Sequence, residues 1–164
     1  GSFDPDVIYN RIEYLASGLE CRVIFLDHLS ILLSGLDGDE RRMIDSTMTR
    51  LRSLVERTGI TLYLVSHLRR SNSDSNSHEE GGRVSLGQLR GSHSISQISD
   101  SVIALERDQQ SEDSNNTSTL RVLKNRYSGE VGVATRLTYD LASCKFYEAD
   151  ETTTTPVFDA STDF

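Results

Sequence analysis

The sequence predicts an α/β fold in which a parallel sheet carries helices on its faces. Residues 22–27 and 60–66 are apolar runs without the alternation of a half-exposed strand, so we expect two strands covered on both faces. Residues 39–57, between them, place apolar side chains at helical spacing. A strand, a helix and a strand in this order form a crossover unit, which makes the two strands parallel neighbours.

The two helices of the first half have defined ends. The helix between the strands should stop at Gly59, because glycine tolerates left-handed backbone at a helix C-terminus. An earlier helix is expected over residues 7–19. Asp4 or Asp6 can cap it, and Pro5 fits its first turn. Its apolar stripe consists of Ile8, Ile12, Leu15 and Leu19.

The second half of the chain has a different pattern. A weaker helix is expected over residues 86–98, followed by a third buried strand at 101–105. Short alternating segments then occur at 120–123, 131–139 and 144–147. Alternation in closely spaced segments favours antiparallel pairing, so we expect these strands as additions to the edge of the parallel sheet.

Length and composition exclude several classes of protein. A chain of 164 residues suits one domain, although a start at Gly1-Ser2-Phe3 rather than methionine suggests a processed product or a fragment. Two cysteines, Cys21 and Cys144, cannot form a secreted disulfide framework or a zinc site. No apolar run approaches the roughly 18 residues of a membrane span, and no signal peptide is present, so we expect a soluble protein without membrane contact.

The charge is unevenly distributed along the chain. The 25 acids exceed the 17 lysines and arginines, a net charge of -8, but residues 148–164 hold five acids and no base. The rest therefore has 20 acids against 17 bases, a net charge of -3. Nearly all bases are arginines, whose guanidinium suits phosphate, so nucleic-acid binding is compatible with this charge. We divide the chain into a folded part, 1–148, and an acidic tail, 149–164, expected to be disordered.

Polar side chains end both predicted parallel strands. Asp27 ends the first strand, and His67 follows the second. The ligand crevice of an open α/β sheet lies at these carboxyl ends, and an acid after a buried strand is typical of a Walker B carboxylate that holds Mg²⁺. The alternatives are that Asp27 caps the next loop and that His67 bonds a loop carbonyl.

Two further segments could contact phosphates. Arg90-Gly91-Ser92 offers a guanidinium and backbone amides, unless it is only a capped helix start. Lys124 and Arg126 lie two residues apart before a turn, a spacing that puts both on one face of a strand. They could clamp a neighbour's phosphates or serve as solvated edge charges that discourage strand aggregation.

In this order, the segments resemble the C-terminal portion of the RecA-like motor domain of DnaB-family ring helicases. The resemblance is closest to the helicase half of the primase-helicases of short-tailed bacteriophages, with the Twinkle helicase as a relative, and covers about residues 7–148. The sequence motifs that carry the resemblance are Ile24-Phe25-Leu26-Asp27-His28, Val65-Ser66-His67-Leu68, His78-Glu79-Glu80-Gly81, Leu89-Arg90-Gly91-Ser92, Ile103-Ala104-Leu105-Glu106-Arg107 and Lys124-Asn125-Arg126-Tyr127-Ser128-Gly129.

The resemblance implies a nucleotide site with Mg²⁺ and either ATP or dTTP as cofactors. Asp27 would lie on the Mg²⁺ side of the triphosphate, and His67 would sense the γ-phosphate. Gln97 would lie between the nucleotide and DNA sites. Tyr139 would stack on the nucleotide base, although it could equally be a sheet-edge aromatic.

The resemblance also implies contacts with neighbours. Arg126 would be an arginine finger that reaches the nucleotide of the adjacent subunit, with Lys124 as its companion. Phe164 ends a tail that resembles the phage helicase C-terminus, which docks onto the replicative DNA polymerase; the alternative is a solubilising tail. The implied residues for single-stranded DNA are Arg69, Arg70, Arg90, Gly91 and Ser92.

The chain departs from the family pattern at three places. Ser96 stands where the phage pattern usually has an arginine. The loop after His67 is poor in lysine, which leaves Arg69, Arg70 and Arg83 to grip DNA. The Gly-x-x-x-x-Gly-Lys-Ser/Thr motif is absent from the sequence, so the cradle for the β- and γ-phosphates must come from another polypeptide segment, as must the catalytic glutamate.

The resemblance as a whole implies part of a replicative phage DNA helicase. Such a protein is a homohexamer that couples NTP hydrolysis to 5'-3' translocation on single-stranded DNA and to duplex unwinding, in the cytoplasm of the infected host cell. This chain alone should not hydrolyse NTP. The alternatives are an inactive module that keeps oligomerisation and polymerase docking, and a RecA-like recombinase.

Overall fold

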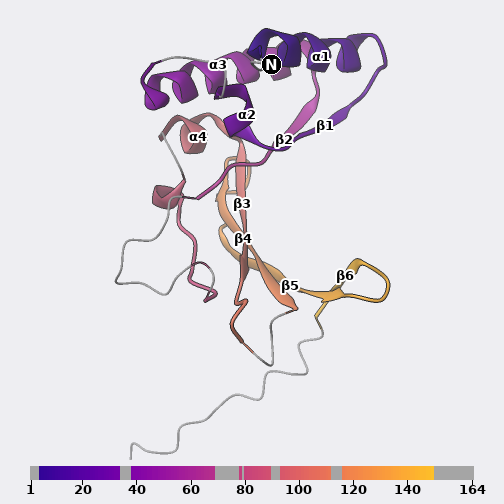
Figure 1. The fold of residues 1–164 in the computed structure, drawn as a ribbon, viewed down its shortest axis with the longest axis vertical. Helices are drawn as coiled ribbons and strands as arrows, with labels where there is room; N and C mark the ends of the chain where they lie inside the picture. Colours follow the sequence, from indigo (N-terminus) through magenta and orange to yellow (C-terminus); the bar gives the residue numbers. More distant parts are fainter. Residues whose placement is uncertain are drawn as a thin grey trace, which may run out of the picture.

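The computed structural model describes residues 4–33, 38–68, 78, 80–89, 93–111 and 116–149. These residues form a helical layer packed on a pair of parallel strands, from which a twisted antiparallel sheet extends (Figure 1). The predicted α/β class is confirmed. Within the described ranges, no helix is both long enough and apolar enough to cross a membrane.

The predicted crossover unit is confirmed. Strands β1 (Val23–Leu26) and β2 (Thr61–Leu64) pair in parallel, and the connection between them runs through α2 (Leu29–Leu33) and α3 (Glu40–Thr58). A parallel pair requires a long crossover because the chain must return to the starting end of the sheet. Both strands therefore end at the same edge.

Local chemistry fixes the helix ends. The Asp39 carboxylate accepts hydrogen bonds from the first backbone N–H groups of α3, and Gly59 ends that helix at a φ of 70°. The earlier helix is α1 (Pro5–Ser17), and its cap is Asp4, whose carboxylate accepts a 2.9 Å bond from the N–H of Asp6. A side-chain oxygen at this position satisfies a helical N–H that has no partner in the helix.

The core lies between the helices and one face of the parallel strands. The stripe predicted for α1 is buried at Ile8 and Ile12, whereas Leu19 lies beyond the helix and is exposed. Helix α3 buries its own stripe against the same cluster. The buried members of this cluster are Ile8, Tyr9, Ile12, Ile24, Leu29, Leu32, Ile44, Met48, Leu51, Leu54, Ile60 and Ile95.

The later strands form a sheet of their own. Strands β3 (Ser101–Arg107), β4 (Thr117–Asn125), β5 (Gly132–Asp140) and β6 (Lys145–Glu148) pair antiparallel in that order. Antiparallel pairing is confirmed, but among the described residues no strand of this sheet pairs with β1 or β2. The expectation that they extend the parallel sheet is therefore not met within this part of the chain.

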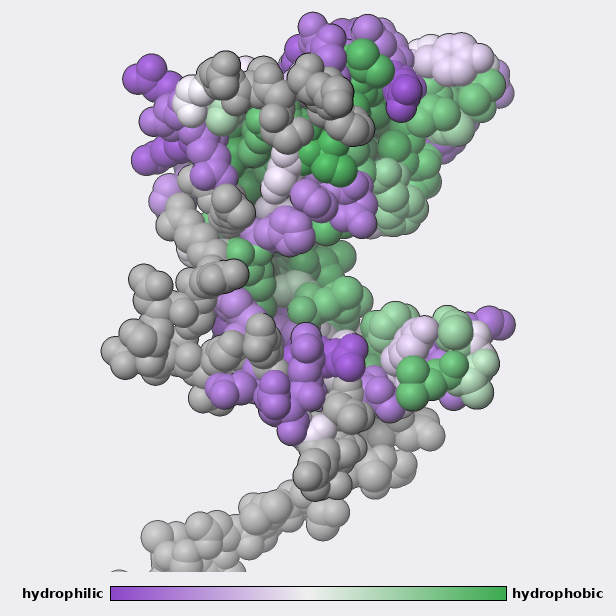
Figure 2. Space-filling model, viewed as in Figure 1, coloured by the Kyte–Doolittle hydropathy of each residue, from purple (hydrophilic) through white to green (hydrophobic). Residues whose placement is uncertain are grey.

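The expectation of strands covered on both faces is wrong for the described residues. The outer face of β1 and β2 carries Phe25 and Tyr63, whose rings stack with centroids 4.7 Å apart. Phe25 is 72% exposed, and Ile103 and Leu105 of β3 are exposed as well. Figure 2 shows hydrophobic residues gathered over β1 and β2 and again along the upper part of β3. Helices of the described chain cover only the opposite face of the parallel pair.

The single helix expected over residues 86–98 is also wrong. A short 3₁₀ helix, η1 (Leu86–Gln88), is followed by extended backbone at Leu89, and α4 (His93–Ile98) begins four residues later. Ser85 caps η1 together with the Gln88 side chain. The small and polar residues of this segment favour such local caps over a continuous helix.

A buried ion pair fastens the segment before η1 to the antiparallel sheet. The Glu106 carboxylate, 8% exposed, accepts bonds of 2.7 and 3.0 Å from the Arg121 guanidinium and one of 2.8 Å from the N–H of Val84. Burial raises the pKa of Glu106, but the bonds from Arg121 and Val84 outweigh it and hold that pKa below its ordinary value of 4.5. The ionised form is therefore the stabilised one.

Replacing Glu106 should destabilise the fold. We expect Glu106→Gln to lower the free energy of unfolding by about 3 kcal/mol, because it leaves the Arg121 charge buried without a partner. Since the pKa of Glu106 is lowered on folding, its contribution is complete above about pH 4.5 and is lost as the pH falls through the folded-state value. Urea unfolding against pH measures both effects, and equal loss in the exposed control Glu130→Gln would contradict the account.

Candidate functional site

The residues predicted at the strand ends come together. Val65, which follows β2, donates its N–H to the carbonyl of Leu26 at 3.0 Å and accepts from the N–H of Leu29 at 2.9 Å. The two chain segments therefore run side by side beyond the parallel strands. Asp27 and His67 lie on these segments, and both side chains are exposed. They share one edge of the sheet, as the sequence predicts, and both are accessible to a ligand.

A second histidine, His28, lies at this edge next to Asp27, although the sequence assigned it no role. The His28 and His67 rings contact edge to face, with centroids 4.4 Å apart. The His28 Nδ1 is buried and has no hydrogen-bond partner among the described residues. The contact limits how the His67 ring can turn, so His28 belongs to the surroundings of the strand-end site.

Asp27 is a residue of the strand-end site that could hold a magnesium ion. Among the described residues, no group of three or more metal-ligating side chains is present. Mg²⁺ commonly uses one or two carboxylates and takes its other ligands from water and substrate phosphates. The exposed Asp27 fits that role as a single carboxylate, and His67 could contact a phosphate oxygen beside it.

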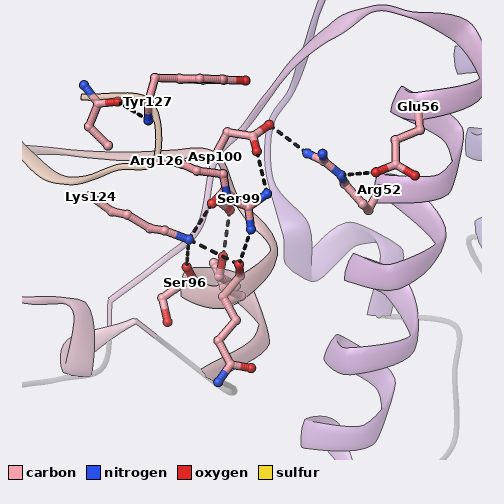
Figure 3. A network of polar contacts seen from close by, with 11 residues as sticks. Arg52, Glu56, Ser96, Ser99, Asp100, Lys124, Arg126 and Tyr127 are labelled. Atoms are coloured by element: carbon pink, nitrogen blue, oxygen red, sulfur yellow. Dashed lines mark hydrogen bonds and ion pairs between the residues drawn. The ribbon is translucent and has the colours of Figure 1, made fainter. Parts of the chain in front are cut away.

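The second group of predicted residues gathers at the carboxyl end of α4 (Figure 3). The Lys124 ammonium donates bonds of 2.7 Å to the carbonyls of Ser96 and Ser99 and a longer one of 3.2 Å to that of Gln97. Carbonyls in the last turn of a helix lack partners within the helix, and a cation placed there is favourable. Lys124 thus caps α4 from the neighbouring strand.

Arg126 converges on the same helix end. It lies in the turn after β4 rather than on the strand, so the predicted arrangement of both cations on one strand face is wrong. Its backbone N–H donates to the Asp100 carbonyl at 2.8 Å, and its Nη1 donates to the Asp100 Oδ1 at 3.1 Å. Its Nη2 approaches the carbonyl of Gln97 at 3.4 Å.

Asp100 joins this helix end to α3. Its second carboxylate oxygen, Oδ2, accepts a 2.7 Å bond from Arg52 of α3, and the Nε of Arg52 donates to Glu56 at 2.7 Å. Neither Asp100 nor Arg52 was predicted as a site residue, because Arg52, Asp100 and Arg126 are far apart in the chain. The register of β3 and β4, with Ser101 opposite Asn125, could have placed Asp100 beside Arg126.

The two remaining described residues occupy separate positions. The Gln97 side chain is exposed on α4, and the contacts of this residue with the two cations use its backbone carbonyl. Tyr139 is half-buried on β5, beside Phe146 of β6, with ring centroids 5.0 Å apart. The aromatic pair offers a stacking surface, and it equally fits the alternative of an aromatic at the sheet edge.

The other predicted residues lie outside the described part of the chain. These residues are Arg69, Arg70, Arg90, Gly91, Ser92 and Phe164. Helix α4 begins at His93, directly after three of them, so the carboxyl end of that helix is only a few residues from the predicted DNA-binding segment.

The crossover unit with its polar strand ends is typical of the α/β class, in which ligands bind at the carboxyl ends of the parallel strands. Residues 3–148 match the family described as DnaB-like helicase C terminal domain, and the chain belongs to this family. The predicted resemblance is confirmed.

Two relatives give the extent of the similarity. The DNA helicase/primase of Enterobacteria phage T3 is 41% identical over 138 residues, which cover 84% of this chain and 24% of that protein. A solved structure of a DnaB-like replicative helicase, described with its interactions with primase, superposes with a TM-score of 0.68 at 18% identity. That match covers 87% of this chain and 34% of the solved chain. This chain thus spans about a quarter of the length of the T3 protein and about a third of the length of the solved chain.

The Lys124 contacts generate a prediction about α4. We expect Lys124→Met to lower the free energy of unfolding by about 1 to 3 kcal/mol, because it strips the carboxyl end of α4 of its donors. The chain's other lysine, Lys145, is exposed on β6 and provides the matched control Lys145→Met. Chemical unfolding measures both variants, and equal stability of the two would contradict the capping role.

Proposed function

We propose that this chain is the finger-bearing part of an NTP-driven replicative DNA helicase. The motor works as a homohexamer that moves 5'-3' along single-stranded DNA and unwinds duplex in the cytoplasm of the infected cell. Membership of the DnaB-like family and the similarity to the T3 helicase/primase support this activity. The observation that carries the proposal is the presentation of Arg126 at a turn, where its side chain is half-exposed and its backbone N–H is bonded to Asp100.

Each subunit binds its own nucleotide at the strand ends. Asp27 would hold a Mg²⁺ ion, which would supply charge neutralisation at the triphosphate of ATP or dTTP. His67 contacts the γ-phosphate beside it. The exposure of both side chains at one sheet edge supports these roles. Tyr139 stacks on the nucleotide base, and its contact with Phe146 supports a flat aromatic surface at that position.

The P-loop that cradles the phosphates comes from another polypeptide segment. The sequence contains no such motif, and the outer face of β1 and β2 leaves Phe25 and Tyr63 exposed. An apolar sheet face of this kind is normally covered in a parallel α/β fold. A two-stranded sheet also gains stability from further strands. We therefore place the P-loop segment against this face and its open edges.

Arg126 acts across the interface between subunits. A guanidinium that reaches the γ-phosphate of a neighbour's nucleotide stabilises the charge that spreads over the phosphoryl oxygens in the transition state. Lys124 supports the finger by fixing the end of β4 to α4, at 2.7 Å from two of its carbonyls. Since Arg126 serves the next subunit, hydrolysis requires the assembled ring.

Single-stranded DNA binds in the pore of the ring. The proposed contacts are Arg69, Arg70, Arg90, Gly91 and Ser92, with Gln97 between the DNA and nucleotide sites. Six copies of these basic segments would release many counterions, so binding should weaken steeply with salt. The acidic tail ends at Phe164 and docks onto the replicative DNA polymerase through its charge and terminal ring.

A second candidate function is an inactive module that retains oligomerisation and polymerase docking. The missing P-loop motif favours it, and it differs from the main proposal in requiring no nucleotide hydrolysis in any assembly. A RecA-like recombinase is the third candidate. Strand exchange without unwinding would favour it over a helicase.

The finger assignment is tested by Arg126→Ala in the P-loop-complete assembly, meaning this chain together with the polypeptide segment that carries the P-loop. We expect DNA-stimulated hydrolysis to fall by about 10³-fold or more, because the transition-state charge loses its partner. The control is Arg136→Ala, an exposed arginine on β5. Steady-state NTP hydrolysis measures the effect, and retained hydrolysis in Arg126→Ala would overturn the assignment.

A further inference from the structure

Asp100 is the carboxylate that joins two arginines in the network at the end of α4 (Figure 3). Its two oxygens bind different arginines, Arg52 at 2.7 Å and Arg126 at 3.1 Å. The third cation, Lys124 of β4, contacts the same helix end, but it donates to backbone carbonyls and not to the Asp100 carboxylate. Asp100 therefore bridges α3 to the turn that carries Arg126.

The backbone strengthens this bridge. The N–H of Arg126 donates to the Asp100 carbonyl at 2.8 Å, so main chain and side chain of the same residue hold Arg126. The Asp100 side chain is about one-third exposed, and that of Arg52 is similar. Partial burial of this kind reduces the screening of the ion pairs by solvent. Without the carboxylate, two neighbouring guanidinium groups would lose the charge they share.

The contacts leave part of the Arg126 guanidinium free. A guanidinium has five N–H donors, and Arg126 uses its Nη1 for Asp100 and directs its Nη2 toward a carbonyl 3.4 Å away. The side chain is 49% exposed. Arg126 can thus remain bound to Asp100 while its other donors face a phosphate oxygen, which is the arrangement expected of a cation that is held in place before it acts.

We propose that Asp100 is a positioning residue for Arg126. It fixes the direction of the finger relative to α3 through Arg52 and relative to α4 through its own backbone. The inference rests on the proposed function of Arg126 and adds to it the group that aims the guanidinium.

The test is the kinetics of Asp100→Asn in the P-loop-complete assembly with single-stranded DNA. We expect kcat to fall by about 10- to 100-fold while KM for the nucleotide stays unchanged, because a misdirected cation weakens the transition state and not ground-state binding. The matched control is Glu56→Gln, which removes a carboxylate from the outer edge of the same network, where its bond within the described residues is to Arg52 and not to Arg126. The control should keep the wild-type kcat.

A double-mutant cycle separates positioning from general stabilisation. In the Arg126→Ala background, Asp100→Asn should have no further effect on kcat, because its effect passes through Arg126. If Asp100→Asn does not fold, Asp100→Glu replaces it in the test. This variant keeps the charge and moves the carboxylate. We expect the same fall in kcat and an unfolding midpoint equal to that of the wild type.

Three results overturn the inference in distinguishable ways. A wild-type kcat in the folded Asp100 variant, beside an inactive Arg126→Ala, would remove the positioning role and leave the finger in place. An equal fall in kcat with and without Arg126 would assign Asp100 to structure alone. Hydrolysis retained in Arg126→Ala would instead remove the finger assignment, and the positioning role with it.

Discussion

The bridge made by the Asp100 carboxylate is the interaction on which the described arrangement of this protein depends. It binds Arg52 of α3 at 2.7 Å and Arg126 of the turn after β4 at 3.1 Å. Helix α3 belongs to the core of the crossover unit, whereas Arg126 belongs to the antiparallel sheet. The bridge therefore connects the part of the fold that carries the strand-end residues to the part that presents Arg126.

The bare sheet face and the bridge point to the same kind of protein. Phe25 and Tyr63 leave one face of the parallel pair uncovered, and the Arg126 side chain is 49% exposed. Both features are unfavourable or idle in an isolated chain. The exposed sheet face and Arg126 would both have a function if a P-loop segment covered the face and the nucleotide of a neighbouring subunit lay beside Arg126. The function then depends on assembly more than on any single chain.

The sequence predicted features set by local chemistry and missed those set by pairing between distant segments. Asp39 and Gly59 end α3 as expected, because a cap requires only nearby backbone. The prediction that β1 and β2 are covered on both faces was wrong for the described residues. Their apolar pattern fits a sheet with a second covering layer, which the described residues do not provide. Asp100 was missed because its contact with Arg126 depends on the register of β3 and β4, which shifts at Val102 and Ile103. Conversely, the grouping of Asp27 with His67 followed from strand direction alone.

Complementation between two defective subunits tests the central claim, that hydrolysis uses residues from adjacent subunits. One P-loop-complete subunit would carry Asp27→Asn and the other Arg126→Ala, so each alone lacks one half of the site. Mixing them places an intact Asp27 beside an intact Arg126 at some interfaces. We expect neither variant alone to hydrolyse NTP, and we expect hydrolysis to return when the two are mixed. Mixtures that assemble but remain as inactive as the separate variants would contradict it.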